Sequence, residues 1–452
     1  REVLPKMTLN DMERESKKVP FYNSDVKGFD TQWNAQATNE LTFLHGFADL
    51  SHMPAELFKY LPLFSVSFGG LGTEKYTYSE LSQRKQNYTG GVSSKWTIHN
   101  HFGHAEGELE EIGIQFGSSA LERNIQPMFE ILKDICTLEP QGVDQLKSLV
   151  QNFTRGMEDR LMSSGHSFAM SYAARNLSEL NRTSEELSGV SYLKFLQSIK
   201  DEDYPTILGK IIEISNYMKE SAPLRFAVNV DEKLFPKVQE GLADFTTDFS
   251  ARSSQGKANL VQTAKESNKI FIPLQSGVNY CSLALPGVRK DHKDYAKLQV
   301  LSLLLSYNYL HPVIREKGGA YGAGLRSGST LKFYSFRDPG LDGTLEAFYG
   351  TPKWLRDANN YSDADIEEAK LSLLGSLDAP VVPSRRGISF FTQGITDELR
   401  QQVRDSIFAT TRDDIVQMAD TYFDNNRMVD APVAVIGNSE QIPEGWEVNS
   451  LE

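Results

Sequence analysis

The stretch His311-Pro-Val-Ile-Arg-Glu-Lys-Gly-Gly-Ala-Tyr-Gly-Ala-Gly324 is the part of the sequence around which we expect the fold to be organised. It follows an apolar run over residues 295–310 with leucines three and four residues apart, which predicts a buried helix ending in a charged turn. The pair Gly318-Gly319 is expected to stop this helix, because glycine is the preferred residue just past a helix end. The glycine-rich residues 320–326 are then expected to form a strand.

Two side chains beside the glycine pair have the chemistry of a carbonyl-binding site. Arg315 and Tyr321 flank the corner, and His311-Pro312 is expected to start the short helix that ends there. A guanidinium and a phenol are both hydrogen-bond donors, so together they suit a carbonyl oxygen that is becoming an oxyanion. The same residues also fit an ordinary helix end with a packed tyrosine and a surface arginine, and spacing alone does not decide between the two interpretations.

The composition excludes several classes of protein. With 452 residues, 40% of them hydrophobic and 24% charged, the chain is expected to be globular and to form two large domains. The formal net charge of −13 argues against DNA or RNA as a partner, because nothing would neutralise the phosphates. No apolar run is long enough to cross a bilayer, so we expect no membrane insertion. Cys136 and Cys281 alone cannot form a disulfide framework.

Strand and helix patterns alternate along the chain, which predicts an α+β fold. Apolar residues alternate over 112–116, as in a half-buried strand, and a helical apolar face follows over 125–136. Residues 142–220 show only helical patterning, before a strand pattern at 224–230. A second series of strand and helix patterns occupies residues 269–436.

These patterns divide the chain into two similar domains, each expected to contain a mostly antiparallel sheet packed with helices. We place the first domain at 21–250 and the second, which carries Arg315 and Tyr321, at 268–452; residues 251–267 form a polar linker between them. Residues 1–20 are expected to be a linker from an N-terminal half.

Two glycine pairs support a duplicated unit. Gly90-Gly91 and Gly318-Gly319 lie 228 residues apart, and each is predicted to follow a helix and precede a strand.

Several motifs in a fixed order resemble the C-terminal half of the pitrilysin-type inverted zinc-motif peptidases, in their organellar branch that degrades presequences. The residues that carry this resemblance are Leu61-Pro-Leu-Phe, Thr89-Gly-Gly-Val-Ser, Met157-Glu-Asp-Arg-Leu, Ser164-Gly-His166, Gly189-Val-Ser-Tyr-Leu-Lys-Phe-Leu, Arg315-Glu-Lys-Gly-Gly-Ala-Tyr-Gly, Ser335-Phe-Arg-Asp-Pro and Gly394-Ile-Thr-Asp-Glu-Leu-Arg. The resemblance runs over nearly the whole chain, which makes it more specific than any one motif.

The resemblance implies an enzyme of two halves that close on each other, each half with two similar α+β domains. It implies that zinc and the general base belong to the N-terminal half, on an H-x-x-E-H helix. Arg315 and Tyr321 would reach that site as catalytic residues that orient the peptide carbonyl, and Gly318, Gly319, Ala320 and Gly322 would bind the substrate. The expected partners are peptide substrates and the N-terminal half, and the expected location is the mitochondrial matrix.

No H-x-x-E-H or H-E-x-x-H motif occurs in the chain, so we expect it to bind no metal and to be inactive alone. The cluster His99-Asn-His101-Phe-Gly-His104 allows a metal site, but no cysteine or carboxylate stands at ligand spacing, and a solvated strand end fits better. We expect His166 to pack or to cap a helix. The glycines after Lys317 fail the nucleotide-binding pattern because Ser327 replaces the last glycine.

The leading functional hypothesis is therefore the second half of a zinc metalloendopeptidase that degrades short unstructured peptides. Two alternatives remain open, a non-catalytic structural or binding subunit of the same superfamily and a free-standing peptide-binding module. Retention of both Arg315 and Tyr321 favours the peptidase, because a scaffold does not need this pair.

Overall fold

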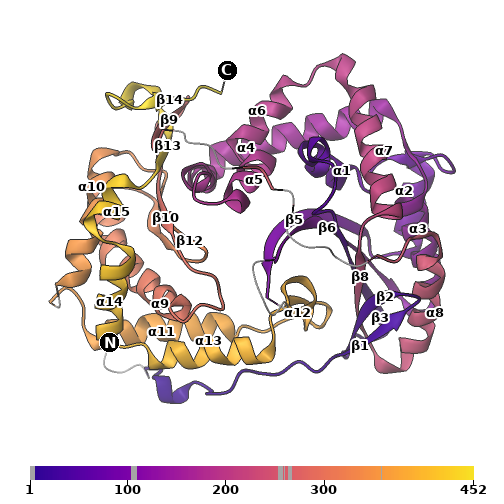
Figure 1. Cartoon of the computed structure of the whole chain (residues 1–452), viewed down its shortest axis with the longest axis horizontal. Coiled ribbons are helices and arrows are strands. Elements are labelled where there is room, and N and C mark those ends of the chain that lie inside the picture. Colours follow the sequence, from indigo (N-terminus) through magenta and orange to yellow (C-terminus); the bar gives the residue numbers. More distant parts are fainter. Residues whose placement is uncertain are drawn as a thin grey trace.

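The chain folds into two six-stranded sheets covered by helices, in the computed structural model shown in Figure 1. The structure describes residues 6–102, 109–252, 258, 260–262, 267–357 and 359–451. This arrangement confirms the predicted α+β fold. Much of the predicted linker 251–267 and the first five residues lie outside the described residues, and the domain limits drawn from the sequence stay a prediction. None of the described helices is both long enough and apolar enough to cross a membrane.

The first sheet has the strand order β1-β2-β8-β3-β6-β5. Its strands are β1 (Tyr22–Val26), β2 (Phe29–Ala35), β3 (Leu41–Asp49), β5 (Val92–His101), β6 (Leu109–Leu121) and β8 (Leu224–Val230). All neighbours are antiparallel except β2 and β8, which are parallel. The short strands β4 (Gly72–Thr73) and β7 (Pro140–Gln141) pair separately.

The second sheet has the strand order β11-β12-β10-β13-β9-β14. Its strands are β9 (Lys269–Leu274), β10 (Tyr280–Pro286), β11 (Gly322–Arg326), β12 (Thr330–Phe336), β13 (Val433–Asn438) and β14 (Glu447–Val448). Strand β9 is parallel to both β13 and β14, and the remaining pairs are antiparallel.

Five strands of each sheet have the same topology. In chain order, β2, β3, β5, β6 and β8 correspond to β9, β10, β11, β12 and β13, and both sets lie in the order first, fifth, second, fourth, third. The first and fifth strands are parallel in both sheets, and the other neighbours are antiparallel. The repeated topology agrees with the duplication that the glycine pairs predicted.

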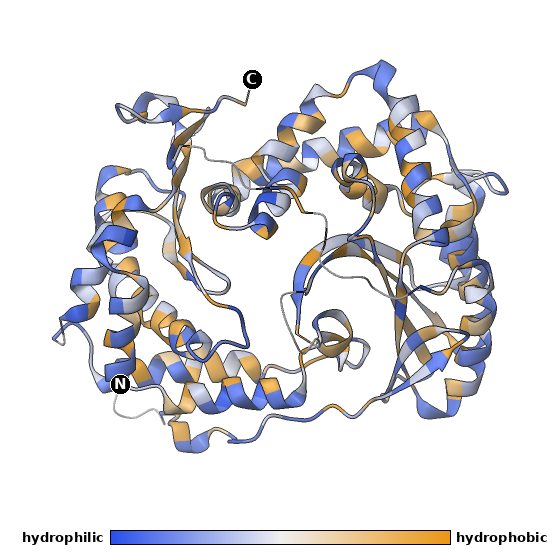
Figure 2. Cartoon of the chain, in the orientation of Figure 1, coloured by the Kyte–Doolittle hydropathy of each residue, from blue (hydrophilic) through white to orange (hydrophobic). Residues whose placement is uncertain are grey.

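The helices differ more between the two units than the strands do. The first unit contains α1 (Leu61–Ser67), α2 (Tyr78–Tyr88), α3 (Ile125–Thr137), α4 (Val143–Ala174), α5 (Glu179–Ser188), α6 (Val190–Ser198), α7 (Tyr204–Glu220) and α8 (Phe235–Phe245). The second contains α9 (Tyr295–Leu305), η7 (Ser306–Lys317), α10 (Asp342–Arg356), α11 (Asp363–Leu377), α12 (Ile388–Gln393), α13 (Asp397–Ala409), α14 (Arg412–Tyr422) and α15 (Asn425–Asp430). Many of these helices are striped with hydrophobic and hydrophilic residues in Figure 2, as expected for helices that cover a core on one side.

The second sheet is buried on both faces. In β13, Val433 and Val435 pack into the core beneath α9, α10 and α14, whereas Ala434 and Ile436 join the core that contains α4. Successive residues of a strand point to opposite faces, so both sets of side chains must be apolar. Helix α4 of the first unit therefore forms part of the cover of the second sheet.

The first sheet has a polar second face. Residues 383–393, from the second unit, lie across this face, where Asn229 donates hydrogen bonds to the carbonyls of Pro383 and Arg386 at 2.7 and 2.9 Å. Phe391 of α12 packs on Phe47 in a small apolar cluster. Each unit thus contributes a segment to the sheet of the other.

The segment before β1 contacts the second unit, although it precedes the first in the sequence. The guanidinium of Arg404 donates a 2.8 Å hydrogen bond to the carbonyl of Glu13, and Arg14 lies 4.0 Å from the ring centre of Phe408. In Figure 1 the segment runs along one side of the molecule from the second unit to the first.

The helix before the glycine pair differs from its prediction. Instead of a break at His311-Pro312, α9 continues directly into η7, a π-helical segment that contains Pro312. Proline lacks an amide hydrogen and clashes with the carbonyl four residues earlier in an α-helix, and wider π turns accommodate it. The predicted start of a short helix at Pro312 is therefore wrong, whereas the predicted stop at the glycine pair is confirmed, since η7 ends at Lys317.

Candidate functional site

The glycine corner is built by hydrogen bonds between its own amides and the preceding helix. The amides of Gly318, Gly319 and Ala320 donate to the carbonyls of Val313, Arg315 and Ile314, at 3.1, 3.0 and 3.1 Å. Gly319 has a φ of +83°, a left-handed conformation that favours glycine. Because these three amides already have acceptors, a peptide at the corner would meet the Cα atoms and carbonyls of these residues.

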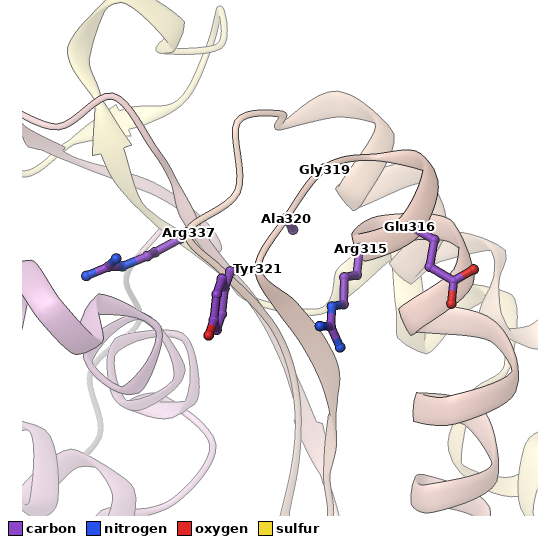
Figure 3. Close-up of a pocket in the computed structure, with 6 residues that line it drawn as sticks. All are labelled: Arg315, Glu316, Gly319, Ala320, Tyr321 and Arg337. Atoms are coloured by element: carbon purple, nitrogen blue, oxygen red, sulfur yellow. The ribbon is translucent and has the colours of Figure 1, made fainter.

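Arg315 and Tyr321 leave this corner in the same direction. Figure 3 shows their side chains projecting side by side, Arg315 from the helix and Tyr321 from the start of the strand, whereas Glu316 points away. Tyr321 is 70% exposed, and Arg315 is also exposed. Among the described residues, neither the Arg315 guanidinium nor the Tyr321 hydroxyl has a hydrogen-bond partner, so both donors are available for a ligand.

Phe336 on the neighbouring strand fixes the ring of Tyr321. The two rings meet edge to face with their centres 5.6 Å apart, and the amide of Tyr321 donates a 3.0 Å hydrogen bond to the carbonyl of Phe336. This contact holds the apolar part of the phenol and leaves its hydroxyl in solvent.

Helix α4 of the first unit packs against Phe336 through His166. The His166 ring lies 4.8 Å from Phe336, which confirms that His166 packs as expected. The helix is kinked at Ser164, which has φ −140° and ψ 33°, and there the Tyr280 hydroxyl donates a 2.5 Å hydrogen bond to the carbonyl of Met162. A side chain at Gly165 would lie 2.3 Å from the Tyr280 ring. The Ser164-Gly-His166 motif therefore packs against the residues that hold the Tyr321 ring.

Arg337 is a site residue to which the sequence analysis gave no role. It lines an open concavity of about 680 Å³ together with Arg315, Glu316, Gly319, Ala320 and Tyr321. The motif Ser335-Phe-Arg-Asp-Pro contained it, but the pairing of β11 with β12 is what brings its main chain within hydrogen-bond distance of the Tyr321 amide. The two strands are consecutive and joined by the short loop Ser327-Gly-Ser329, which is a hairpin signal, but the register of the pair was not predicted from it.

Strand β11 is an edge strand, because among the strands that the structure describes it pairs only with β12. Part of its outer edge is already occupied, since the amide of Leu325 donates a 2.9 Å hydrogen bond to Ser306 Oγ at the start of η7. The stretch Gly322–Gly324 is thus the part of the edge nearest the candidate site. Gly322, predicted to bind substrate, begins this strand and has no atom nearer than 4.0 Å to the position of an added side chain.

The expectation that the histidine cluster forms a solvated strand end is wrong for His99. His99 is buried in β5, and its Nε2 lies 3.2 Å from Glu111 Oε2 on the facing strand. Glu111 also accepts hydrogen bonds from Arg225 at 3.0 and 2.6 Å. The sequence analysis missed Glu111 because the pairing of β5 with β6 brings it opposite His99. His104 lies outside the described residues.

This carboxylate network does not fit a metal ion. Burial alone would raise the pKa of Glu111, but the hydrogen bond from His99 and the charge and hydrogen bonds of Arg225 lower that pKa to about 2. A guanidinium already occupies the carboxylate oxygens that a cation would need. Within the described ranges, no group of three or more His, Cys, Asp and Glu side chains is placed to hold a metal.

Comparisons with known proteins place the chain in a family. Residues 1–199 match a family described as associated with peptidases of the M16 group, subgroup C, and residues 269–439 match the PreP C-terminal domain. The mitochondrial presequence protease of Danio rerio is 31% identical over 462 residues, which cover 96% of this chain and 45% of that protein. The chain therefore spans about half the length of the curated relatives it matches.

Solved structures share the fold at low sequence identity. The peptidase M16 inactive domain from Pseudomonas fluorescens has a TM-score of 0.65 at 14% identity, covering 96% of this chain and all of that one. Pitrilysin has a TM-score of 0.62 at 13% identity, and the match covers 99% of this chain and 48% of pitrilysin. At this identity the solved structures show the fold alone; the two matched domains and the 31% identity to a presequence protease show that the chain belongs to the presequence protease family of M16 peptidases.

Proposed function

We propose that this chain acts as the C-terminal half of a zinc metalloendopeptidase that degrades short unstructured peptides such as cleaved targeting presequences. In this proposal Arg315 and Tyr321 are catalytic residues that donate hydrogen bonds to the carbonyl oxygen of the bond being cut. Mitochondrial relatives support a location in the mitochondrial matrix.

The main support for this proposal is that the Arg315 guanidinium and the Tyr321 hydroxyl are both exposed, lack hydrogen-bond partners among the described residues and point the same way from the glycine corner. Donors that are already oriented stabilise the negative charge that develops on a carbonyl oxygen, and a single donor of this kind contributes about 3 kcal/mol. The described residues of this chain offer no zinc ligand set, so we assign the metal and the general base to the N-terminal half.

The edge of β11 supports a main-chain contact with the substrate. A peptide that adds a strand at Gly322–Gly324 would place its backbone beside Tyr321 without requiring particular side chains. Broad specificity follows from this contact, and the net charge of −13 favours basic peptides.

Complementation tests the proposal. Peptidase activity is measured for this chain alone with zinc, and again after a matching N-terminal half with an H-x-x-E-H motif is added. We expect activity only in the mixture. Activity of this chain alone that a chelator abolishes would contradict the assignment of zinc to the other half.

Substitutions in the mixture test the two donors. We expect Arg315→Ala and Tyr321→Phe each to lower kcat at least about tenfold, since about 1.4 kcal/mol corresponds to a factor of ten. Lys317→Ala, which removes an exposed cation from the same turn, serves as the control. Unchanged rates in both variants would favour a non-catalytic structural or peptide-binding subunit.

A further inference from the structure

Arg337 has an unusual backbone conformation for its residue type. Its φ is +49°, in the left-handed region, which residues other than glycine adopt at a conformational cost. Glycine would adopt this conformation without strain, so an arginine here points to a use for its side chain. Strained residues of this kind gather at ligand sites, where the surrounding structure holds them.

The residue after Arg337 is held by a buried network. Asp338 accepts hydrogen bonds from Thr344 Oγ1 at 2.6 Å and from the amide of Gly340 at 2.9 Å. Its main chain exchanges two hydrogen bonds with Asn279, at 2.7 and 2.9 Å. Because Asp338 is only 1% exposed, this network fixes the peptide unit from which the Arg337 side chain leaves.

Arg337 is coupled directly to the candidate catalytic tyrosine. The amide of Tyr321 lies 3.3 Å from the carbonyl oxygen of Arg337, to which it donates a hydrogen bond. Phe336 contacts both side chains, with its ring centre 5.6 Å from the Arg337 guanidinium carbon and 5.6 Å from the Tyr321 ring centre. In Figure 3, Arg315 and Arg337 lie on opposite sides of Tyr321.

The concavity is locally basic on an acidic chain. Arg315 and Arg337 line it without an ion-pair partner among the described residues, and its one acidic residue, Glu316, points away from both. The chain as a whole has a net charge of −13. A guanidinium with free donors binds a carboxylate through two parallel hydrogen bonds, a geometry that lysine does not provide.

We propose that Arg337 is a specificity-determining residue that binds a carboxylate of the peptide substrate. The inference rests on the proposed function, because it takes the scissile carbonyl to lie at Arg315 and Tyr321. A peptide that continues past Tyr321 on the side away from Arg315 passes the Arg337 guanidinium. The carboxylate belongs either to an acidic side chain or to the free C-terminus, which share the same chemistry.

The test uses the enzyme reconstituted from this chain and its zinc-bearing half, with matched peptides. In one series of pairs, the two peptides differ by Glu or Gln at a single position, and the position is moved around the cut bond from pair to pair. In a further pair, the peptides differ by a free or an amidated C-terminus. For Arg337→Gln we expect the ratio of kcat/KM between charged and neutral members of a pair to fall about tenfold, mainly through KM, because a charge-assisted hydrogen bond contributes on this scale. Arg326→Gln, which removes a cation from the far end of β11, is the control.

Two further variants separate charge from backbone conformation. Arg337→Gly removes the side chain and relieves the left-handed strain, so the same loss of discrimination as in Arg337→Gln assigns the effect to the guanidinium. Arg337→Lys is expected to recover part of the discrimination, because it restores charge without the planar fork.

The outcomes distinguish the two possible sources of the carboxylate. A changed ratio only in the C-terminal pair identifies the terminal carboxylate, whereas a changed ratio only in a Glu/Gln pair identifies a side chain. An equal loss for charged and neutral peptides, or no loss, overturns the inference. If Arg315→Ala still lowers kcat on the neutral amidated peptide, the proposed function stands in that case; if it does not, the proposed function itself fails.

Discussion

The molecule contains two glycine corners that share a backbone device but not their side-chain chemistry. Gly90-Gly91 follows α2 and precedes β5, and Gly318-Gly319 follows η7 and precedes β11, at topologically equivalent places. The second glycine of each pair has a positive φ, +111° in Gly91 and +83° in Gly319. The duplicated fold thus supplies the corner twice.

The residues around the corners differ in their capacity to stabilise an oxyanion. Three residues before the pair, the first corner has Asn87 where the second has Arg315; two residues after it, Ser93 stands in the place of Tyr321. Asparagine and serine are short and uncharged, whereas the guanidinium and phenol extend beyond the backbone. The repeat therefore provides the position of the corner, while two side chains provide the proposed chemistry.

The surroundings of the corners differ as well. The second sheet is enclosed by apolar cores on both faces, which gives Tyr321 a rigid base. The first sheet leaves a cavity of about 760 Å³ between its strands and residues 385–393, lined by Ser94, Thr97 and Gln115 among others. Here the contacts with the covering segment are hydrogen bonds and the small apolar cluster of Phe47 and Phe391, in place of a continuous core.

Replacing Arg315 and Tyr321 by the residues of the first corner is expected to cause the largest loss of activity. Arg315→Asn combined with Tyr321→Ser makes the second corner resemble the first, and we expect kcat of the reconstituted enzyme to fall at least about a thousandfold, because one oxyanion donor is worth about 10²–10³ and the losses of two donors that act as a unit do not simply multiply. Steady-state kinetics on one unstructured peptide measures the loss.

A reciprocal control substitutes the two equivalent residues of the first corner. Asn87→Ala and Ser93→Ala in the first corner are expected to leave kcat within about twofold, as is usual for surface substitutions away from a site. Loss of activity at the first corner equal to that at the second would show that both corners contribute to the reaction.

The buried ion pair of the first sheet gives the next effect. Arg225→Ala would leave the Glu111 carboxylate buried without its cation, which costs about 3–5 kcal/mol of unfolding free energy. Arg225 also donates to the carbonyl of Phe391 at 3.2 Å, so α12 loses an anchor on the sheet. Urea denaturation measures the change, and the added substitution Glu111→Gln should recover part of it.

The same pair predicts how stability depends on pH. Folding lowers the pKa of Glu111 from its ordinary value of 4.5 to about 2, so its contribution is complete above pH 4.5 and is lost as the pH falls towards 2. In the Glu111→Gln variant this part of the acid dependence should disappear. An unchanged acid transition in the variant would mean that Glu111 does not carry it.

Local periodicity allowed much of the fold to be predicted. The strand at 224–230, the long helical region after 142 and the glycine stop at Lys317 all depend on residues close in sequence, and the structure has them. The pairing of His99 with Glu111 and the placement of Arg337 beside Tyr321 depend on strand register. Register depends on the turn that joins two strands as well as on their hydrophobic pattern, so these contacts were not predicted, although the paired strands follow each other in the chain.

The packing of α4 on the second sheet is a contact between segments far apart in sequence, and two glycines in this helix test it. Gly165→Ala would place a methyl group 2.3 Å from the Tyr280 ring, and such overpacking costs about 1–3 kcal/mol of unfolding free energy. Gly156 in the same helix is exposed, and a methyl group added there would have no atom within 4 Å outside its own helical turn, so Gly156→Ala should stabilise by about 0.5–1 kcal/mol.

Measuring kcat for Gly165→Ala and Gly156→Ala shows whether the packing of α4 also affects activity. Tyr280 and His166 both contact Phe336, which holds the Tyr321 ring, so Gly165→Ala should also lower kcat, whereas Gly156→Ala should not. Thermal unfolding and turnover measured on the same preparations give both quantities. Gly165→Ala could instead lower stability and leave kcat unchanged. In that case Phe336 holds Tyr321 without help from α4, and the second corner does not depend on the first unit.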